Sequence, residues 1–273
     1  MVNNYQKAFK QAIRSKYMLN LVDVHAHFDL GEYDKDLPEV IEDAKNKGIK
    51  AVVINGVNRE SNRKVLELAK KFNILKPALG YYPVHVAEDP WEKVEEELNF
   101  IKNNKEKVAL GEVGLDYKHG DDNPHGDLHK DVQKKAFQKF IEISEKTKKP
   151  LIIHSRKAEL DVIEMLESSS LKNPVMHCFL GKKKLMQRIA DNGWNLSVPV
   201  IITKLQQLQE MVEYTNINQL LTETDSPYLS PVQGERNTPA NIVLTIKKIA
   251  EIKGFEEEEI ANNIFMNYQK LFL

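Results

Sequence analysis

The sequence is poor in cysteine and has no long apolar run. One cysteine among 273 residues cannot form an intramolecular disulfide, which fits a reducing compartment. No run approaches the roughly 18 apolar residues that a membrane span needs. Segment 1–20 is basic but has neither the apolar stretch nor the small-residue cleavage site of a secretory signal. By elimination, we expect a cytoplasmic protein with no membrane partner.

The sequence also lacks an excess of charge of one sign. Its 39 Lys and Arg side chains stand against 40 Asp and Glu, which gives a net charge of -1. This balance excludes a nucleic-acid-binding protein whose whole surface is basic, but it is compatible with a local basic groove. A hydrophobic fraction of 41% with 12 glycines and 11 prolines excludes collagen-like and wholly disordered chains.

What the sequence does contain is a regular series of short apolar runs. They recur about every 25–30 residues, the length of one strand–helix unit. Eight runs are predicted as strands: 21–27, 50–56, 74–80, 107–115, 150–156, 174–179, 194–198 and 219–225. Their nearly continuous Val, Ile and Leu residues are typical of parallel strands buried on both faces. We therefore predict one α/β domain, a (β/α)₈ TIM barrel over residues 21–273. Seven strands would fit nearly as well, because 194–198 is the weakest run.

Segments with helical spacing separate these runs. Asp36 is a predicted N-cap of the first. Thr238 is a predicted N-cap after the last strand, with Pro239 at the first helical position. Segment 1–20 is predicted to be a short extra helix packed on the barrel exterior. Its apolar residues recur every four positions: Tyr5, Phe9, Ile13 and Tyr17.

Polar residues stand at the ends of five of the predicted strands. Six of them are of metal-ligand type: His25, His27, Glu112, His154, His177 and Asp225. Because barrel strands all end at one face, we expect these side chains to converge on one mouth. One such residue alone is more often a core or solvated side chain, but six together predict a binuclear metal hydrolase site.

The residue types suit a pair of divalent cations. His25 and His27 are spaced i, i+2, so both imidazoles point to one side of an extended segment and can coordinate one cation. Glu112 has glycines close on both sides, and its two oxygens could serve one metal each. Asp225 can hold a metal and take a proton from the water bound there.

Four neighbouring side chains have candidate roles, and three of them have two interpretations each. Asp23 could orient a ligand histidine. Asp116 is either a further polar contact or a helix cap. Arg156 either binds an anion through its planar fork or forms a structural salt bridge. Arg236, after the last strand, either contacts phosphate or braces the start of a helix.

Six ordered motifs resemble the TatD family of metal-dependent deoxyribonucleases: DVHAHFD, GEVGLDY, IIHSR, MHCFLG, ETDSPYLSP and RNTPANI. The resemblance covers residues 21–273 and implies a TIM barrel of the amidohydrolase-like superfamily. The first implied metal site consists of His25, His27, Glu112 and Asp225. The second shares Glu112 and adds His154 and His177. The resemblance further implies divalent-cation-dependent hydrolysis of phosphodiesters, often exonucleolytic, with DNA as the substrate.

The sequence departs from the family around the implied substrate site. Tyr82 in GYYPVH stands where the family usually has histidine, and Leu180 replaces a small polar residue. Segment 118–130 is longer and richer in histidine than is usual. Further histidines could line the mouth, although a solvated loop is favoured: His85, His119, His125 and His129. The predicted substrate contacts are Tyr82, Arg156 and Arg236.

The predicted function is hydrolysis of DNA by a water activated between two divalent cations, Mg²⁺, Mn²⁺ or Zn²⁺, with Glu112 and Asp225 as the catalytic residues. The first alternative is hydrolysis of a small-molecule ester, lactone or aminoacyl bond. Related amidohydrolases commonly bridge their metals with a carboxylated lysine, and Glu112 in that place argues against that branch. The second alternative is a non-catalytic metal-binding protein, against which the complete ligand set argues. No stable protein partner is predicted.

Overall fold

The strands form a single parallel sheet in the computed structural model, which describes residues 19–118 and 126–273. In chain order they are β1 (Leu21–Ala26), β2 (Ile49–Asn55), β3 (Leu75–Leu79), β4 (Ala109–Asp116), β5 (Leu151–Arg156), β6 (Pro174–His177), β7 (Asn195–Pro199) and β8 (Leu220–Glu223). Each strand pairs in parallel with the next one along the chain. All eight predicted strands are confirmed, including the weakest, which is β7.

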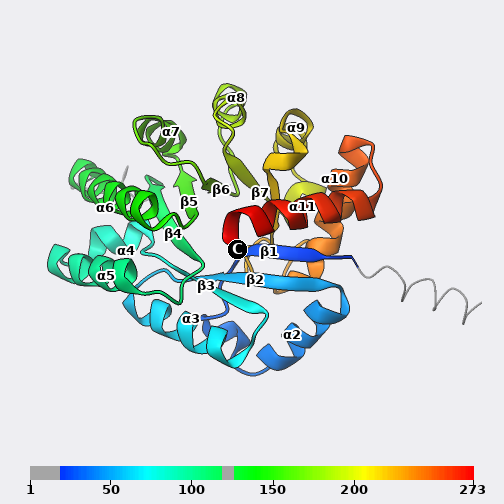
Figure 1. Ribbon diagram of the computed structural model, residues 1–273, viewed down its shortest axis with the longest axis horizontal. Coiled ribbons are helices and arrows are strands. Elements are labelled where there is room, and N and C mark those ends of the chain that lie inside the picture. The colour runs from blue at the N-terminus through cyan, green and yellow to red at the C-terminus, as the bar shows by residue number, and fades with distance from the viewer. Residues whose placement is uncertain (1–18, 119–125) are drawn as a thin grey trace, which may run out of the picture.

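The sheet closes between β8 and β1. Ala26 and Ser226 form a parallel bridge. Beside it, the main-chain N–H of Asp225 donates to the carbonyl of His25 at 2.8 Å, and that of His27 donates to Ser226 at 2.7 Å. Buried main-chain groups need such partners, and closure supplies them at the seam. The predicted (β/α)₈ barrel is confirmed, with its helices arranged around the strands (Figure 1).

Helices alternate with the strands and surround them. Their bounds are α2 (Leu37–Asn46), α3 (Arg59–Lys71), α4 (Pro83–Glu88), α5 (Trp91–Asn103), α6 (Gly126–Thr147), α7 (Glu159–Glu167), α8 (Lys183–Asp191), α9 (Gln206–Tyr214), α10 (Ile242–Lys253) and α11 (Glu257–Phe272). Short 3-10 helices lie at Gly31–Tyr33, Val200–Thr203, Ile217–Gln219 and Pro239–Asn241.

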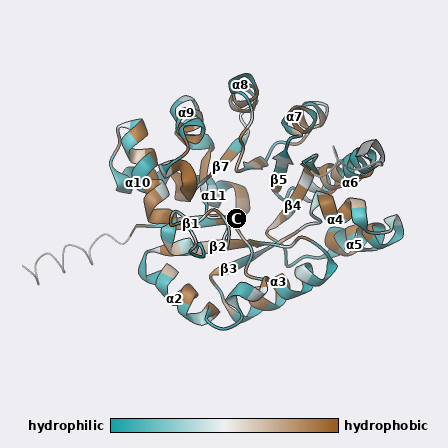
Figure 2. Cartoon of the chain, turned by 180° about the vertical axis from the view of Figure 1, so that it is seen from behind, coloured by the Kyte–Doolittle hydropathy of each residue, from teal (hydrophilic) through white to brown (hydrophobic). Residues whose placement is uncertain are grey.

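The core lies inside the barrel and between the strands and helices. All eight residues of β4 are buried, which explains why its sequence shows no alternation. Helices instead bury one stripe, and α2 does so with residues three to four apart: Leu37, Val40, Ile41 and Ala44. Figure 2 shows this contrast, with brown strands and helices of mixed colour.

Two predicted helix caps lie at helix starts but do not act as caps. Asp36 precedes α2, and Thr238 precedes the turn Pro239–Asn241, yet neither side chain bonds to its helix. The carboxylate of Asp36 instead forms a forked ion pair with Arg236, at 3.0 and 2.6 Å. The capping prediction for Asp36 is wrong because a residue far along the chain takes its oxygens.

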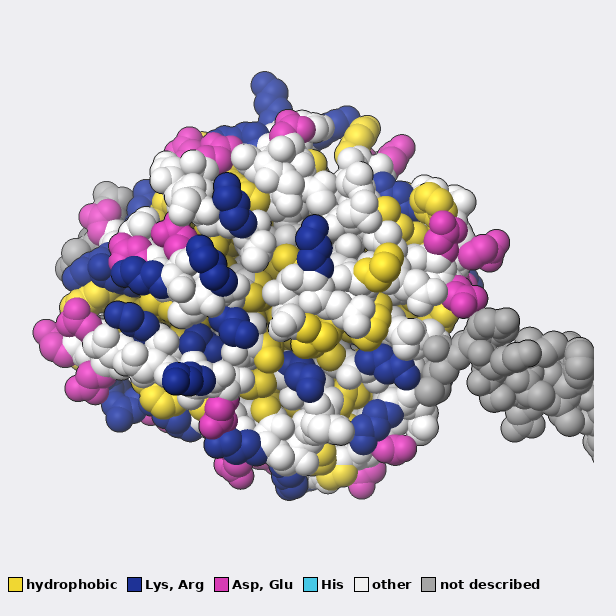
Figure 3. All heavy atoms as spheres, viewed as in Figure 1, with side chains coloured by type: hydrophobic (Ala, Val, Ile, Leu, Met, Phe, Trp, Pro, Cys, Tyr) yellow, Lys and Arg dark blue, Asp and Glu magenta, His cyan; other side chains and the backbone are white. Residues whose placement is uncertain are grey.

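The C-terminal helix α11 packs against both β1 and β8. Its Asn267 side chain donates to the carbonyls of Ile217 and Leu220, at 2.8 and 2.9 Å. Figure 3 shows the molecule from the side of α11, where Lys and Arg are interspersed with Asp and Glu. No helix in the described ranges is long and apolar enough to span a membrane. The predicted helix of segment 1–20 and much of segment 118–130 lie outside the described residues.

Candidate metal centre

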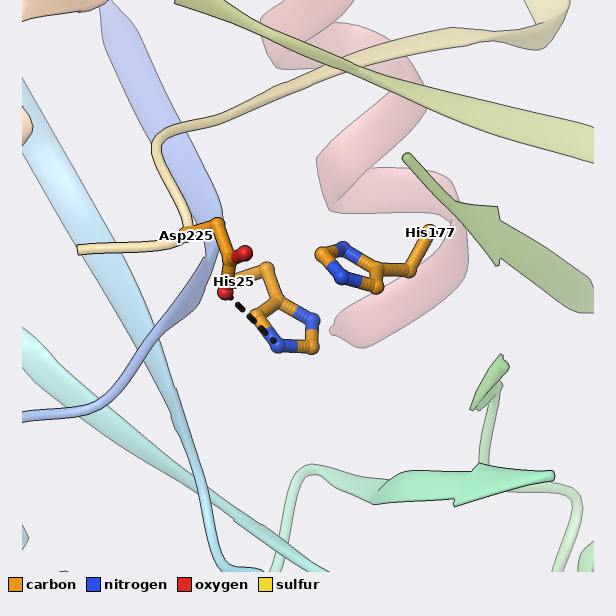
Figure 4. A group of neighbouring side chains, drawn as sticks. All are labelled: His25, His177 and Asp225. Atoms are coloured by element: carbon orange, nitrogen blue, oxygen red, sulfur yellow. Dashed lines mark ion pairs between the residues drawn. The ribbon is translucent and has the colours of Figure 1, made fainter. Parts of the chain in front are cut away.

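The carboxyl ends of five strands bring six potential metal ligands together. Their ligand atoms form three overlapping groups, each within 4.8 Å: His25, His177 and Asp225; His25, His27 and Glu112; and Glu112, His154 and His177. Figure 4 shows the first group, in which the side chains from three separate strand ends face one another. The structure thus brings together all six residues that the sequence singled out.

The two carboxylate oxygens of Glu112 face different histidines. Oε1 lies 2.9 Å from Nδ1 of His154. Oε2 lies 3.5 Å from Nε2 of His25 and 3.4 Å from Nε2 of His27. A buried carboxylate with imidazoles on both sides has the arrangement that bridging two cations requires.

The donor atoms around His25 and His27 have the spacing of ligands to one ion. Their Nε2 atoms are 3.1 Å apart, and Oδ1 of Asp225 lies 3.7 Å from His25 and 3.5 Å from His27. Ligand atoms about 2.1 Å from an ion are separated by roughly 3.0–3.4 Å. Neutral imidazoles combined with carboxylates suit divalent transition metals. The residues present therefore fit a divalent cation.

Burial and neighbouring charge shift the pKa values of these groups in different directions. Burial lowers the pKa of His25, and so does the charge of His177, whose ring stacks on it at 3.7 Å. Burial would raise the pKa of Glu112, but hydrogen bonds from His154, His25 and His27 hold it well below its usual range. These two shifts favour a neutral His25 and an ionised Glu112, the forms that bind a cation.

Contacts on the second ring nitrogen orient two of the histidines. Nδ1 of His27 donates to the carbonyl of Asn55 at 3.1 Å. Nδ1 of His177 lies 2.8 Å from Oε2 of Glu223, which also accepts from the Ser197 hydroxyl at 2.5 Å. Burial would lower the pKa of His177, but the charge of Glu223 raises it to about 9. Such contacts fix the ring orientation and leave the other nitrogen for a metal.

Asp116 connects His154 to Tyr82. One of its oxygens lies 2.9 Å from Nε2 of His154 and accepts from the Tyr82 hydroxyl at 2.8 Å. The other accepts from the main chain of Lys118 at 2.9 Å. Of its two interpretations, Asp116 is thus the further polar contact, and it positions a ligand-type histidine.

Asp23 holds the main chain and not a histidine ring. Its carboxylate accepts from the main-chain N–H of His25 at 3.1 Å and from that of Thr224 at 3.0 Å. The Thr224 hydroxyl donates to it at 2.5 Å. Burial raises the pKa of Asp23 to about 7 against these hydrogen bonds. The predicted orientation of a ligand ring by Asp23 is wrong, because the residue ties β1 to β8.

Close main-chain packing fixes the position of Glu112. A Cβ atom on Gly80 would lie 2.4 Å from the carbonyl carbon of Gly111 and 2.5 Å from the nitrogen of Glu112. Only glycine permits this approach. At the seam, Asp225 has a φ of 57°, in the left-handed region that few residues with a Cβ adopt. Backbone strain of this kind is concentrated at functional sites.

A cleft of about 670 Å³ opens at these residues. Tyr82, His85 and Arg156 line its wall. His85 belongs to α4 and is not in a solvated loop, and its Nδ1 donates to the Val57 carbonyl at 3.0 Å. His129 lies in α6. Two other histidines expected near the mouth lie outside the described residues: His119 and His125.

The two candidate arginines have different surroundings. Arg156 is exposed at the end of β5 and forms no ion pair within the described part of the chain. Arg236 pairs with Asp36 and lies over the ring of Tyr33, at 4.3 Å. Asp36 neutralises the charge of Arg236, and neither residue lines the cleft. These contacts favour the alternative, a brace, and the substrate contact of Arg236 stays a prediction.

Two residues that support the site were missed at the level of sequence. Asn55 ends β2 and orients His27, while Ser197 in β7 bonds to Glu223. Asn55 acts through its main-chain carbonyl, which any residue at this position would offer, so no side-chain pattern could have revealed it. Ser197 is a polar residue in the middle of an apolar run, and that contrast is the signal that could have found it.

Comparison with known proteins agrees with this architecture. The family model for TatD related DNase matches residues 22–273. An uncharacterized metal-dependent hydrolase of Methanocaldococcus jannaschii is 34% identical, over 92% of this chain and 96% of its own. Deoxyribonuclease TATDN3 of Homo sapiens is 30% identical, over 93% and 95%.

The fold has solved counterparts as well. The crystal structure of YjjV, a TatD homolog from Escherichia coli, has a TM-score of 0.84 and 23% identity, covering 94% of this chain and 99% of its own. At that identity the likeness concerns the fold. The family match, in contrast, runs over nearly the whole sequence and all of the barrel. The chain therefore belongs to the TatD family of metal-dependent hydrolases.

Proposed function

We propose that the protein hydrolyses phosphodiester bonds of DNA from a strand end, with two divalent cations. The observation that carries this proposal is the Glu112 carboxylate, which faces His154 with one oxygen and the pair His25 and His27 with the other. A bridged pair of cations suits phosphodiester hydrolysis, because negative charge develops on both the attacking and the leaving oxygen.

The residues divide into two ligand sets. The first set is His25, His27, Glu112 and Asp225, and the second is Glu112, His154 and His177. When bound, the cations would supply Lewis acidity, lowering the pKa of water and neutralising phosphoryl charge. Mg²⁺, Mn²⁺ and Zn²⁺ are the candidates, with imidazole ligands favouring the latter two.

Asp225 is the proposed general base. Burial would raise its pKa, but the hydrogen bond from His27 and the charge of His177 lower it. The carboxylate is therefore ionised and can accept a proton from the attacking water. Arg156, in the cleft wall, offers a planar fork to the phosphoryl oxygens as their charge grows.

Sequence similarity supports a nuclease, since one relative that matches nearly all of the chain is named a deoxyribonuclease. Hydrolysis of a small-molecule ester, lactone or aminoacyl bond would use the same water and the same base, so substrate assays must separate the two. The cytoplasmic location and the absence of a stable protein partner are proposals from the sequence alone.

The test is digestion of end-labelled single-stranded DNA by protein stripped with EDTA and reloaded with Mg²⁺, Mn²⁺ or Zn²⁺. We expect stepwise shortening that requires metal and is lost in Asp225→Asn. Elemental analysis of the reloaded protein gives the number of metals bound. If protein that carries two metals leaves DNA intact and cleaves an ester or lactone, the nuclease proposal is overturned in favour of the alternative.

A further inference from the structure

The cleft has few positive charges for a site that would bind a polyanion. Among residues 19–118 and 129–273, one Lys or Arg lines the cleft, and it is Arg156. Glu159, three residues on in the first turn of α7, lines the same cleft with negative charge. Segment 119–125 contains no Lys or Arg. Proteins that follow a nucleic acid strand use a groove with several cations, and their affinity depends steeply on salt.

In contrast, several apolar and aromatic side chains line the cleft. Leu180 and Tyr228 line it and remain 40% and 53% exposed. Leu30 and Leu229 also line the cleft. Exposed apolar side chains that gather at a cleft mark a binding surface for an apolar or aromatic group.

The aromatic part of this surface lies next to the metal ligands. The ring of Tyr228 is 6.3 Å from that of His27, centroid to centroid, at an angle of 62°. The main chain of Tyr228 is held by a hydrogen bond to the carbonyl of Asp225, at 2.8 Å. A base attached to a phosphate at the metal ligands is therefore within reach of this ring, and stacking on aromatic rings is how proteins hold unpaired bases.

The main chain at Leu180, the other exposed apolar residue of the cleft, is held in place by hydrogen bonds. The Gln207 side chain donates to the carbonyls of Leu180 and Gly181, at 2.6 and 2.9 Å. Gly181 lies against the ring of Phe179, where a Cβ atom would come within 2.4 Å. Leu180 thus stands in place before any ligand arrives, which reduces the entropic cost of binding.

We propose that the cleft recognises a single nucleotide unit at the scissile bond and does not follow a longer strand. The base packs between Tyr228 and Leu180, and Arg156 contacts the one phosphate that is cleaved. The substrate class is accordingly the shortest oligonucleotides and the terminal unit of longer ones. This inference rests on the proposed function, because it places the phosphate at the metal ligands.

The first experiment measures kcat/KM of the full-length Mn²⁺-loaded protein on a thymidine dinucleotide, a tetramer and a 20-mer. We expect values that agree within about threefold, because Arg156 is the one Lys or Arg among residues 19–118 and 129–273 that lines the cleft. We also expect a fall of only about threefold when salt is raised fourfold, as a single phosphate contact predicts. A rise of tenfold or more with length, combined with a steep salt dependence, would overturn the proposal in favour of a strand-following groove.

The second experiment measures binding and not turnover. Thymidine 5′-monophosphate and 2-deoxyribose 5-phosphate are titrated into the Mn²⁺-loaded protein by calorimetry. We expect Tyr228→Ala to weaken the nucleotide about tenfold and the sugar phosphate little, while Tyr228→Phe recovers most of the loss. Tyr214→Ala is the matched control, because Tyr214 is also 53% exposed but lies on α9, among residues that do not line the cleft.

The two experiments separate this inference from the proposed function. If no phosphodiester is cleaved but nucleotide binding depends on Tyr228 as described, hydrolysis of DNA is wrong and single-nucleotide recognition is supported. If DNA is cleaved but the nucleotide and the sugar phosphate bind equally well, the hydrolase stands and the recognition of one base is overturned.

Discussion

The carboxylates of this site each bind more than one partner. Glu112 faces imidazoles on both sides, and Oε2 of Glu223 contacts both His177 and Ser197. Asp225 combines a place beside His25 and His27 with a left-handed backbone. At this scale, changing a carboxylate to its amide keeps the shape of the side chain and removes its charge and one acceptor oxygen, so amide variants are the most informative.

Asp225→Asn is expected to lower kcat by about 10²–10⁴-fold, because an amide cannot accept the proton of the attacking water. The measurement is hydrolysis of a chromogenic phosphodiester in the presence of excess Mn²⁺. Glu167→Gln is the control, since Glu167 forms a surface ion pair with Arg188 at the end of α7. Equal rates for Asp225→Asn and the unmodified protein would contradict the role of general base.

Glu223→Gln is expected to weaken the binding of one metal by about 10–100-fold, because the charge that orients His177 is lost. Competition with a chromogenic chelator measures the affinity. Ser197→Ala, which removes only the second hydrogen bond to Glu223, should have a smaller effect. An unchanged affinity in Glu223→Gln would show that His177 is positioned without this carboxylate or is not a ligand.

Whole elements place these residues through main-chain contacts. The end of β3 packs so tightly on β4 that Gly80 touches the peptide of Glu112. Asn62 of α3 holds Gly80 from behind, accepting from its N–H at 3.1 Å and donating to its carbonyl at 2.9 Å. The position of Glu112 therefore depends on an element that contributes no ligand.

Gly80→Ala is expected to destabilise the fold by about 1–3 kcal/mol and to displace Glu112, because the added methyl group has no space. Urea unfolding measures the first effect, and metal titration of the folded variant measures the second. Gly31→Ala is the matched control, since the nearest atom to its added Cβ is 3.7 Å away. Normal metal binding in Gly80→Ala would contradict the dependence of Glu112 on this contact.

The ion pair of Asp36 and Arg236 joins the start of α2 to the loop after β8. The hydrogen bond from Arg236 lowers the pKa of Asp36 below its ordinary value of 3.8. The pair therefore contributes stability above that value and loses it as the pH falls through the lower, folded-state pKa. Asp36→Asn should have a lower Tm than the unmodified protein at about pH 6, and the difference should shrink once the pH falls below 3.8. A constant difference across this range would contradict the assignment.

The elements themselves could be predicted from the sequence, but their contacts could not. Most strands are nearly continuous apolar runs because they are buried on both faces, so a run such as 107–115 is visible without any partner. The roles of Asp36, Arg236 and Asp23 depend on residues about two hundred positions away. Local patterns contain no information on such partners, and these are the side chains whose predicted roles were wrong or left open.

At the scale of the molecule, the barrel has to be closed between its first and last strands, and α11 covers that junction. Asn267→Ala is expected to lower the free energy of unfolding by about 2 kcal/mol, because the carbonyls of Ile217 and Leu220 lose their donor. Chemical denaturation measures the change. Lys270→Ala, an exposed position on the same helix, should change stability by less than about 0.5 kcal/mol. Equal effects of the two substitutions would contradict a specific role of Asn267.

Closure between β1 and β8 also sets the moment at which the site can form during synthesis. His25 is among the first residues of the barrel to leave the ribosome, but Asp225, which bonds to it across the seam, follows two hundred residues later. A nascent chain that has produced β1 to β7 therefore has the four ligand-type histidines and Glu112, but it lacks Asp225 and the strand that completes the barrel. In the proposed ligand sets, a chain that ends before residue 225 lacks one ligand of the first set, so it should bind divalent cations more weakly than the full chain.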